Sequence, residues 1–414
     1  MELAREICQD LLLLDSHIDW PESVLLNPRN ISKKNSTGEF DYERAKMGGL
    51  NAVLSVLYVN YKYDLKKGRE TFDSLYTIVN SYIKDYPEKF AQAITPDEIS
   101  RNFKKGLLSI PLCLENGSII GNDINYVSYL KELGITYITL SHNRSNQIGD
   151  ANADTNRPWK GLSPFGEKVV DEMNRVGILI DISHSSDKTV IQVLKKSKAP
   201  IIATHSSCRH FTPGYERNLS DELIKEIAKK EGVVMVAFGS MFLDSTCSRK
   251  INYLIHYFDS TGVSYQSEEG MQFIQEFWQN NKIIAKAEHI VDHIDHMVEL
   301  AVINHVGLGS DFDGVGPTMP EKMSDVSAYP VIVAELLNRG YSKKEIEKIL
   351  GKNYLRVWRK ALDVADSLTR KEKTEEQDQK SVPSVSVPLT GLFSEPFLRD
   401  LDLIWRVDSN IVVV

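Results

Sequence analysis

Short apolar runs alternate with amphipathic helical stretches along most of the chain, and this alternation constrains the fold more than any other feature. Strands that alternate with helices form parallel sheets through right-handed crossover connections. Eight such units predict an α/β fold of the (β/α)8 TIM-barrel type. We expect the strands at residues 11–14, 51–57, 107–114, 135–140, 178–182, 201–203, 233–237 and 306–308.

A doubly wound open sheet is the alternative that the same alternation allows. Such a sheet normally carries a glycine-rich phosphate-binding loop after its first strand. In this chain the corresponding residues read DSHIDWP, from Asp15 to Pro21, and contain no glycine. The barrel is therefore the favoured prediction.

The chain is expected to divide into a barrel at residues 1–368, a linker at 369–388 and a C-terminal tail at 389–414. The linker is charged and then rich in Ser, Val and Pro. The apolar tail is expected to pack on the barrel or on a partner subunit. Residues 240–287 form a long aromatic-rich insertion between the seventh and eighth strands. We interpret this insertion as a lid or substrate wall, or else as a purely structural excursion.

Composition limits the class of protein. Hydrophobic residues make up 42% of the chain and charged residues 26%, as in ordinary globular proteins. The net charge of −8 argues against nucleic-acid binding, which needs a basic surface. Four scattered cysteines predict free thiols. Neither a signal peptide nor a membrane span is recognised, so a cytoplasmic location is expected.

His17 and Asp19 directly follow the first apolar run. Residues two apart in a strand point to the same face, so both side chains would project together at the rim where barrel enzymes place their chemistry. An imidazole beside a carboxylate suits a zinc-type ion. The alternative is an aspartate that caps a helix beside an ordinary histidine.

Glu115 ends another apolar strand and precedes the turn-forming Asn116-Gly117. Its two carboxylate oxygens could bind two ions, although a solvent-facing loop glutamate is the alternative. His184 and His205 also end apolar runs, and each is followed by two serines. The predicted strands one, three, five and six each carry a His, Asp or Glu at the same end. An independent chance placement of all these residues is therefore a poor explanation. Together these residues predict a metal site.

Asp311, at the end of the eighth strand, can serve as a general acid or base beside a metal-bound water. Asp313, two residues away, is the rival carboxylate. A calcium loop is excluded because the other ligands of that loop are missing. The remaining histidines are given ordinary structural roles: His289, His293 and His296 on a packed helix, and His210, His256 and His305 elsewhere.

Residues 11–362 resemble the membrane (renal-type) dipeptidases, a zinc metallopeptidase family of the amidohydrolase-like TIM barrels. The motifs that carry the resemblance are long and occur in the family's order. They are HID after the first strand, Glu115, YITLSHN, GLSPFGEKVVDEMNRVGILIDISHSS, ATHSS, ERN, GSDFDGV and DVSAYPVIVAELLNRGYS.

The resemblance implies two zinc ions per subunit. His17 and Asp19 would bind one ion, His184 and His205 the other, and Glu115 would bridge the two. It further implies that a metal-bridging hydroxide attacks the peptide bond of a dipeptide. A homodimer is also suggested by the resemblance.

Three further residues match substrate-binding and catalytic positions of the family. His142 would bind substrate and polarise the scissile carbonyl, Arg217 would hold the substrate's C-terminal carboxylate, and Asp311 would contact substrate as the catalytic acid and base. This chain departs from the family at Glu115-Asn116-Gly117, where the family usually has Glu-Gly. It also departs at Arg144, and in an extra residue between His205 and Arg217.

Two other functions remain open on the same barrel. Another metal-dependent amidohydrolase, such as an N-acyl amino acid deacylase or a lactonase, would keep the metal site and change the substrate. A non-catalytic binding protein would keep only the scaffold. The presence of competent residues at every expected metal-ligand position argues against the second.

Overall fold

The computed structural model describes residues 1–263, 267–281 and 284–381. Within these residues all strand pairings of the main sheet are parallel, in the order β10-β9-β8-β7-β6-β5-β2-β4-β3, with β1 beside β2. The strands are β1 (Leu13–Ile18), β2 (Leu50–Tyr58), β3 (Phe90–Gln92), β4 (Leu108–Ile110), β5 (Leu112–Glu115), β6 (Ile135–Thr139), β7 (Leu179–Asp181), β8 (Ile202–Ala203), β9 (Val233–Val236) and β10 (Val306–Leu308).

The sheet closes into a barrel where β1 meets the segment that follows β10. Ile18 and Phe312 form a parallel bridge. The amide of Asp19 donates to the Phe312 carbonyl at 2.9 Å, and the amide of Asp311 donates to the His17 carbonyl at 3.0 Å. The predicted TIM-barrel fold is therefore confirmed, with β1, β2 and β5 to β10 as its wall.

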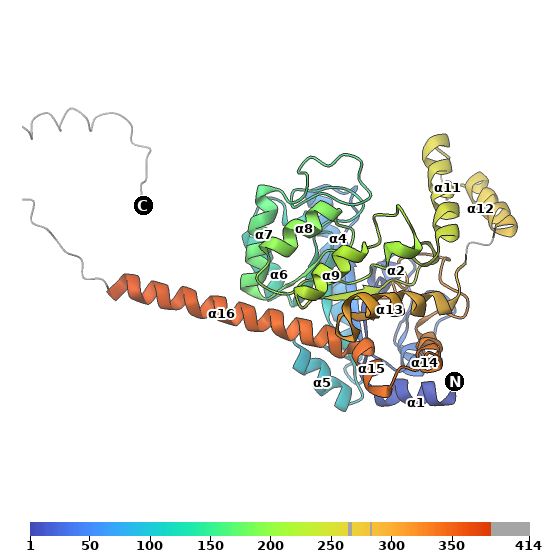
Figure 1. The fold of residues 1–414 in the computed structure, drawn as a ribbon, viewed down its shortest axis with the longest axis horizontal. Coiled ribbons are helices and arrows are strands. Elements are labelled where there is room, and N and C mark those ends of the chain that lie inside the picture. Colours follow the sequence, from blue (N-terminus) through green and yellow to red (C-terminus); the bar gives the residue numbers. More distant parts are fainter. Residues whose placement is uncertain (264–266, 282–283, 382–414) are drawn as a thin grey trace, which may run out of the picture. The chain divides into compact units, whose positions relative to one another are not determined.

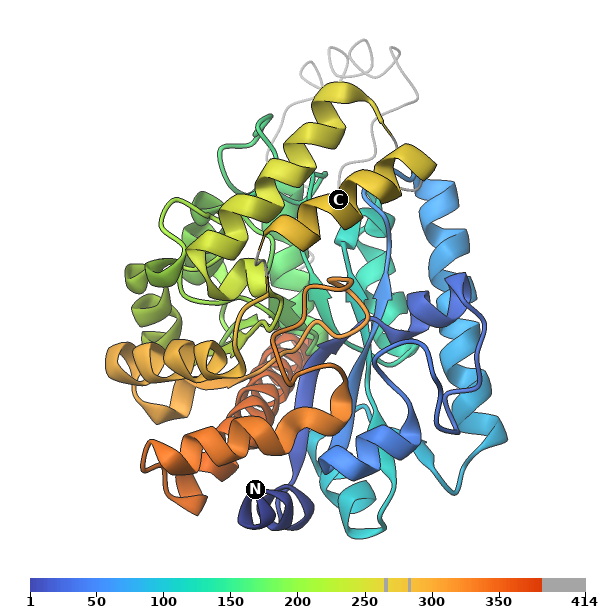
Figure 2. The same ribbon diagram turned by 90° about the vertical axis from the view of Figure 1, so that its right-hand side faces the viewer.

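Helices surround this wall (Figures 1 and 2). Helices α6 to α9 pack successively against one another, and α13 and α14 continue the ring to α1. The helices are α1 (Glu2–Asp10), α2 (Trp20–Leu26), α3 (Tyr42–Gly48), α4 (Leu65–Asp85), α5 (Pro96–Lys104), α6 (Asn125–Glu132), α7 (Pro164–Val176), α8 (Asp187–Lys196), α9 (Asp221–Lys229), α10 (Ser240–Leu243), α11 (Ser245–Thr261), α12 (Glu268–Asn280), α13 (Ala287–Ala301), α14 (Tyr329–Asn338), α15 (Lys343–Glu347) and α16 (Asn353–Ser381). Short 3-10 or π turns are η1 (Gly117–Ile120), η2 (Arg209–Phe211), η3 (Ile303–His305), η4 (Val326–Ala328) and η5 (Lys348–Lys352).

Local sequence signals explain where several of these helices begin and end. The side chains of Ser163, Ser186 and Ser220 accept hydrogen bonds from amides in the first turns of α7, α8 and α9. Serine at this position satisfies an amide that would otherwise lack a partner. Helix α7 ends at Gly177, whose φ of 73° is the left-handed conformation that favours glycine.

The observed strands depart from the expected ones mainly at β1 and β3, and the single strand expected at 107–114 forms two strands, β4 and β5. β1 begins at Leu13 and continues to Ile18, whereas residues 11–14 were expected. The apolar run alone was a poor guide because the polar residues of β1, including Asp15 and His17, are completely buried. The three-residue strand β3 was not expected; it pairs only with β4, and such a short strand carries no period-two pattern.

Side chains of the strands alternate between two apolar clusters. Leu13 and Val53 belong to the larger cluster, which includes the surrounding helices, whereas Leu14 and Leu54 belong to the smaller one. This alternation is the period-two geometry of a strand, with one face toward the helices and the other inside the barrel. Tyr354 and Trp358 of α16 belong to the inner cluster.

The insertion predicted between the seventh and eighth barrel strands lies between β9 and β10 and contains α10, α11 and α12. Figure 2 shows α11 and α12 (yellow) beyond one end of the strands. All four cysteines are buried and free, as predicted. Among the described residues, no helix is both long and apolar enough to cross a membrane.

The chain divides into two compact units, residues 1–368 and 369–414. In the second unit, α16 continues to Ser381 and so includes part of the predicted linker. The predicted tail at 389–414 lies outside the described residues. Its packing on the barrel or on a partner subunit stays a prediction.

Asp15 holds the closure of the barrel together from the inside. Its carboxylate accepts hydrogen bonds from the amides of His17 at 2.9 Å and Ser310 at 3.1 Å. The hydroxyl of Tyr329 donates to the same carboxylate at 2.6 Å. Burial raises the pKa of Asp15 to about 6, and the hydrogen bonds from Tyr329, His17 and Ser310 oppose this rise by stabilising the ionised carboxylate.

We therefore expect Tyr329→Phe to lower the free energy of unfolding by about 1–3 kcal/mol, because a buried carboxylate loses a donor. Urea denaturation followed by circular dichroism measures this change. Tyr354→Phe is the matched control, since the buried Tyr354 hydroxyl has no hydrogen-bond partner among the described residues. Equal destabilisation by both substitutions would show that the Tyr329–Asp15 hydrogen bond contributes nothing.

Candidate active site

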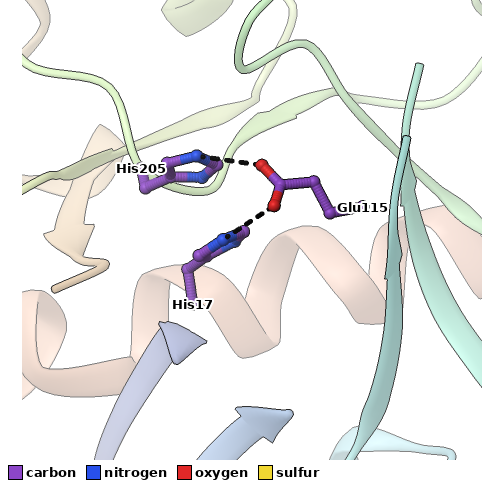
Figure 3. A group of neighbouring side chains, drawn as sticks. All are labelled: His17, Glu115 and His205. Carbon is purple, nitrogen blue, oxygen red and sulfur yellow. Dashed lines mark ion pairs between the residues drawn. The ribbon is translucent and has the colours of Figure 1, made fainter. Parts of the chain in front are cut away.

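Five residues predicted as metal ligands meet at the carboxyl end of the barrel. His17 lies in β1 and Asp19 directly follows it, Glu115 is the last residue of β5, and His184 and His205 follow β7 and β8. All five are less than 9% exposed. Figure 3 shows one oxygen of the Glu115 carboxylate directed at the ring of His17 and the other at the ring of His205.

The two oxygens of Glu115 face different histidines. Oε2 lies 3.7 Å from Nε2 of His17, whereas Oε1 lies 3.4 Å from Nε2 of His205 and 3.2 Å from Nε2 of His184. Asp19 adds a carboxylate oxygen 3.6 Å from Nε2 of His17. Ligand atoms of His17, Glu115 and His205 lie within 4.8 Å of one another, and so do those of Glu115, His142 and His184, so that Glu115 belongs to both groups.

The unsatisfied atoms of the site fit a metal centre. Nε2 of His17, Oδ2 of Asp19 and Oε1 of Glu115 are buried and make no hydrogen bond with another described residue. Buried polar atoms without partners cost free energy unless a ligand satisfies them. Imidazole nitrogens and carboxylate oxygens are the donor set that zinc and similar ions prefer. The residues present therefore fit divalent cations.

A second layer of hydrogen bonds orients the histidine rings. Nδ1 of His17 lies 2.9 Å from the hydroxyl of Tyr137, and Nδ1 of His205 lies 2.8 Å from Oγ1 of Thr204. Thr204 in turn donates to the buried carboxylate of Asp181 at 2.7 Å. Partners of this kind fix which ring nitrogen faces a metal.

Burial favours the neutral, metal-binding form of His184 and His205. Burial also opposes protonation of His17, but Glu115 and other nearby carboxylates together outweigh it, so the pKa of His17 is raised. Burial and the charge of Arg217 lower the pKa of His184 well below its ordinary value, and burial lowers that of His205 similarly. Burial opposes ionisation of Glu115, but His17 and His142 hold its pKa well below the usual range. Metal binding requires neutral imidazoles and ionised carboxylates, and the directions of these shifts favour that state at His184, His205 and Glu115.

Three residues at the site have backbone conformations that are uncommon outside glycine. His184 and Asp311 both have φ of 65°, and Asn116 has φ of 78°. Such conformations are strained and cluster at functional sites, where contacts with the surrounding structure hold them in place. Asparagine tolerates this region better than most residues, so Asn116 is compatible with a position where the resemblance expects glycine.

The structure separates the rival carboxylates Asp311 and Asp313. Asp311 lines the cavity above the five residues. Asp313 instead pairs with Arg29 at 3.2 Å and accepts hydrogen bonds from Ser23 at 3.1 Å and from the amide of Glu39 at 2.8 Å. These partners hold Asp313 among the loops, and of the two carboxylates only Asp311 is among the cavity-lining residues that the structure describes.

The cavity has a volume of about 950 Å³, and Arg217 and His142 line it. The guanidinium of Arg217 is buried, donates to Oγ of Ser206 at 3.0 Å and lies 3.0 Å from Nε2 of His184. It makes no ion pair with any residue that the structure describes. A buried cation without an internal counter-ion is suited to an anionic substrate group.

His142 lies beside the shared carboxylate, with Nε2 3.9 Å from Oε1 of Glu115. Its ring packs edge-on against Tyr58, with centroids 4.9 Å apart, and stacks on Tyr61 at 5.9 Å. Burial lowers the pKa of His142 to about 4. The ring is therefore neutral and can donate one hydrogen bond into the cavity.

Other cavity residues were not identified from the sequence. Glu22 lies in α2 and carried no recognisable signal, while His256 was given an ordinary structural role and lines the cavity instead. The insertion, interpreted from the sequence as a lid or substrate wall or else as a structural excursion, supplies four residues of the cavity lining: Met241, Phe242, Asn252 and His256. Trp20 is buried and donates to Oγ of Ser55 at 2.7 Å, which is a core role.

Outside the cavity, the histidines of α13 serve packing and ion pairing. His293 is buried between the Cys208 amide, at 2.9 Å, and the Leu243 carbonyl, at 3.1 Å. His296 pairs with Asp221 at 2.9 Å and stacks on His210 with ring centroids 4.3 Å apart. Possible metal-ligand atoms of His210, Asp221 and His296 lie within 4.8 Å of one another. However, the ion pair already gives His296 and Asp221 a partner.

Comparisons with known proteins agree with this geometry. The family model described as membrane dipeptidase (peptidase family M19) matches residues 1–372. The dipeptidase tcpJ of Claviceps purpurea is 29% identical over 374 residues, which are 85% of this chain and 78% of that protein. The dipeptidase verJ of Clonostachys rogersoniana is 29% identical over 392 residues, or 90% of this chain and 89% of the relative.

Solved structures share the fold. The probable dipeptidase PvdM from Pseudomonas aeruginosa superposes with a TM-score of 0.77 at 24% identity, covering 88% of this chain and 98% of its own. A Rhodobacter sphaeroides metallopeptidase, liganded with a phosphinate mimic of the dipeptide L-Ala-D-Ala, has a TM-score of 0.72 at 22% identity. That match covers 85% of this chain and 99% of the other. The chain therefore belongs to the membrane dipeptidase family, peptidase family M19, and is a metal-dependent dipeptidase.

Proposed function

We propose that this dipeptidase holds two zinc ions bridged by Glu115 and uses them to cleave the peptide bond of dipeptides. The observation that carries the proposal is the division of Glu115, with one oxygen toward His17 and the other toward His184 and His205. His17 and Asp19 would hold one ion, and His184 and His205 the other. When bound, such ions acidify water and polarise a carbonyl group.

Arg217 supplies recognition of the substrate's free C-terminal carboxylate. Its guanidinium is buried in the cavity wall and unpaired among the described residues. Arginine binds carboxylates through two parallel hydrogen bonds, which fix orientation as well as affinity. Because Arg217 lies 3.0 Å from His184, a carboxylate held there would be close to the metal ligands, and productive substrates would be short.

Asp311 and His142 carry the proton and charge transfers of this mechanism. The carboxylate of Asp311 would accept a proton from the attacking water and return it to the leaving amine nitrogen. His142, neutral because of its burial, would donate a hydrogen bond from Nε2 to the oxygen of the scissile carbonyl as negative charge develops. Both residues line the cavity.

Removal of the bridging carboxylate should remove metal as well as activity. We expect Glu115→Gln to lower the metal content from two ions per chain to one or none, because an amide is a much weaker bridging ligand than a carboxylate. Inductively coupled plasma mass spectrometry of purified protein measures this. Chelation of the wild type should abolish turnover, and added Zn²⁺ should restore it. Full turnover by metal-free protein would rule the mechanism out.

Asp311→Asn should lower kcat by about 10²–10⁴-fold while metal remains bound, because the acid and base is lost without the ligands. Steady-state hydrolysis of Ala-Ala and metal analysis of the same samples measure both quantities. Asp313→Asn is the matched control, since that carboxylate lies two residues away and outside the cavity. A kcat that falls equally in both variants would contradict the role of Asp311.

Arg217→Ala should lower kcat/KM for a dipeptide by about 100-fold, the loss expected for a buried charge-assisted contact. The amide of the same dipeptide lacks the carboxylate and should be affected far less. Equal losses on both substrates would refute carboxylate binding at Arg217. N-acyl amino acids present the same carboxylate, so their faster hydrolysis by the wild type would favour a deacylase instead.

A further inference from the structure

Glu22 is an acidic side chain on the cavity wall that the hydrolytic mechanism does not use. It lies in the first turn of α2 and lines the cavity together with Tyr58 and Tyr61. It is only partly exposed and makes no hydrogen bond or ion pair with the residues that the structure describes. Burial and the charge of Glu115 raise its pKa to about 7, as expected for a carboxylate without a nearby cation.

The barrel places Glu22 across the cavity from Arg217. Glu22 follows β1, and its neighbour Tyr58 ends β2, whereas Arg217 follows β8. In the closed barrel β2 is four strands from β8 in either direction, through β7, β6 and β5 or through β9, β10 and β1. The metal ligands lie between these two sides.

Glu22 lies on the Asp19 side of the metal site, because Asp19 is the N-cap of α2 and Glu22 lies in the first turn of that helix. Burial is the largest cause of the raised pKa values of Asp19 and Tyr58. The negative charge of Glu22 raises both pKa values further, which agrees with its position near these two residues. Arg217 instead contacts His184. A dipeptide with its carboxylate on Arg217 and its peptide bond at the metal site would therefore extend its N-terminal residue toward Glu22.

Tyr58 and Tyr61 give this side of the cavity an aromatic surface. Both rings pack on His142, which lies next to Glu115. Tyrosine faces attract cations and also contact aliphatic chains. A carboxylate beside two tyrosines is thus complementary to a long side chain that ends in a positive charge, such as that of lysine or arginine.

We propose that Glu22, Tyr58 and Tyr61 form a subsite for a cationic side chain on the N-terminal residue of the substrate. This inference rests on the proposed dipeptide hydrolysis, with the substrate carboxylate at Arg217. It assigns a substrate class, lysyl and arginyl dipeptides, to the same site. Glu22 acts here as a specificity residue, whereas the chemistry belongs to Asp311 and the metal ligands.

The test compares Lys-Ala with norleucyl-Ala, which has a side chain of similar length without the charge. We expect the wild type to prefer Lys-Ala by about tenfold or more in kcat/KM, as for a partly buried charge-assisted contact. Glu22→Gln should reduce this preference toward unity. Glu22→Lys should reverse it, so that Glu-Ala becomes a better substrate than Lys-Ala.

The matched control is Glu132→Gln. Glu132 is exposed, ends α6 and precedes β6, so it lies at the end of the barrel opposite to the cavity. This variant should keep the wild-type preference. Loss of activity on every dipeptide by the same factor in Glu22→Gln would overturn the subsite, because Glu22 would then act on the α-ammonium group or on the fold. A wild type that cleaves no dipeptide would instead contradict the proposed function itself.

Discussion

The closure of the barrel between β1 and the segment after β10 is the constraint on which the site depends. Backbone hydrogen bonds join His17 to Asp311 and Asp19 to Phe312. The Asp15 carboxylate reinforces this junction from within through Ser310 and Tyr329. Because the strands are parallel, their carboxyl ends share one rim, and closure brings the first and last strands of the barrel to the same cavity.

Several buried polar atoms at that rim have no hydrogen-bond partner among the described residues. Glu115 and Asp19 are buried close to one another, and His17, His184 and His205 surround them. Burial of so many ionisable groups without a cation is unfavourable, so metal binding and folding stability are linked in this architecture. The left-handed backbone of His184 and Asp311 belongs to the same pattern, in which local strain is tolerated where side chains must converge.

Around the metal site the cavity is chemically asymmetric. Arg217 provides a buried positive charge on the β8 side, while Glu22 and two tyrosines line the side of β1 and β2. The insertion adds Phe242, over whose ring the Arg217 guanidinium lies 5.1 Å from the centroid. Our proposals therefore assign hydrolysis and substrate selection to different parts of one cavity. The proposed metal ligands lie at the strand ends, and the proposed selecting residues lie in the loops and helices that follow them.

The sequence by itself determined the barrel, because strand and helix periodicities are local patterns that survive without tertiary information. It also placed His17, Glu115, His184 and His205 at strand ends, and parallel topology then requires such ends to meet. Only the tertiary structure placed Asp311 at the cavity and paired Asp313 with Arg29, extended β1 through buried polar residues, and brought Glu22 and His256 to the cavity. Those outcomes depend on register, barrel closure and loop packing between distant residues, which no local pattern encodes.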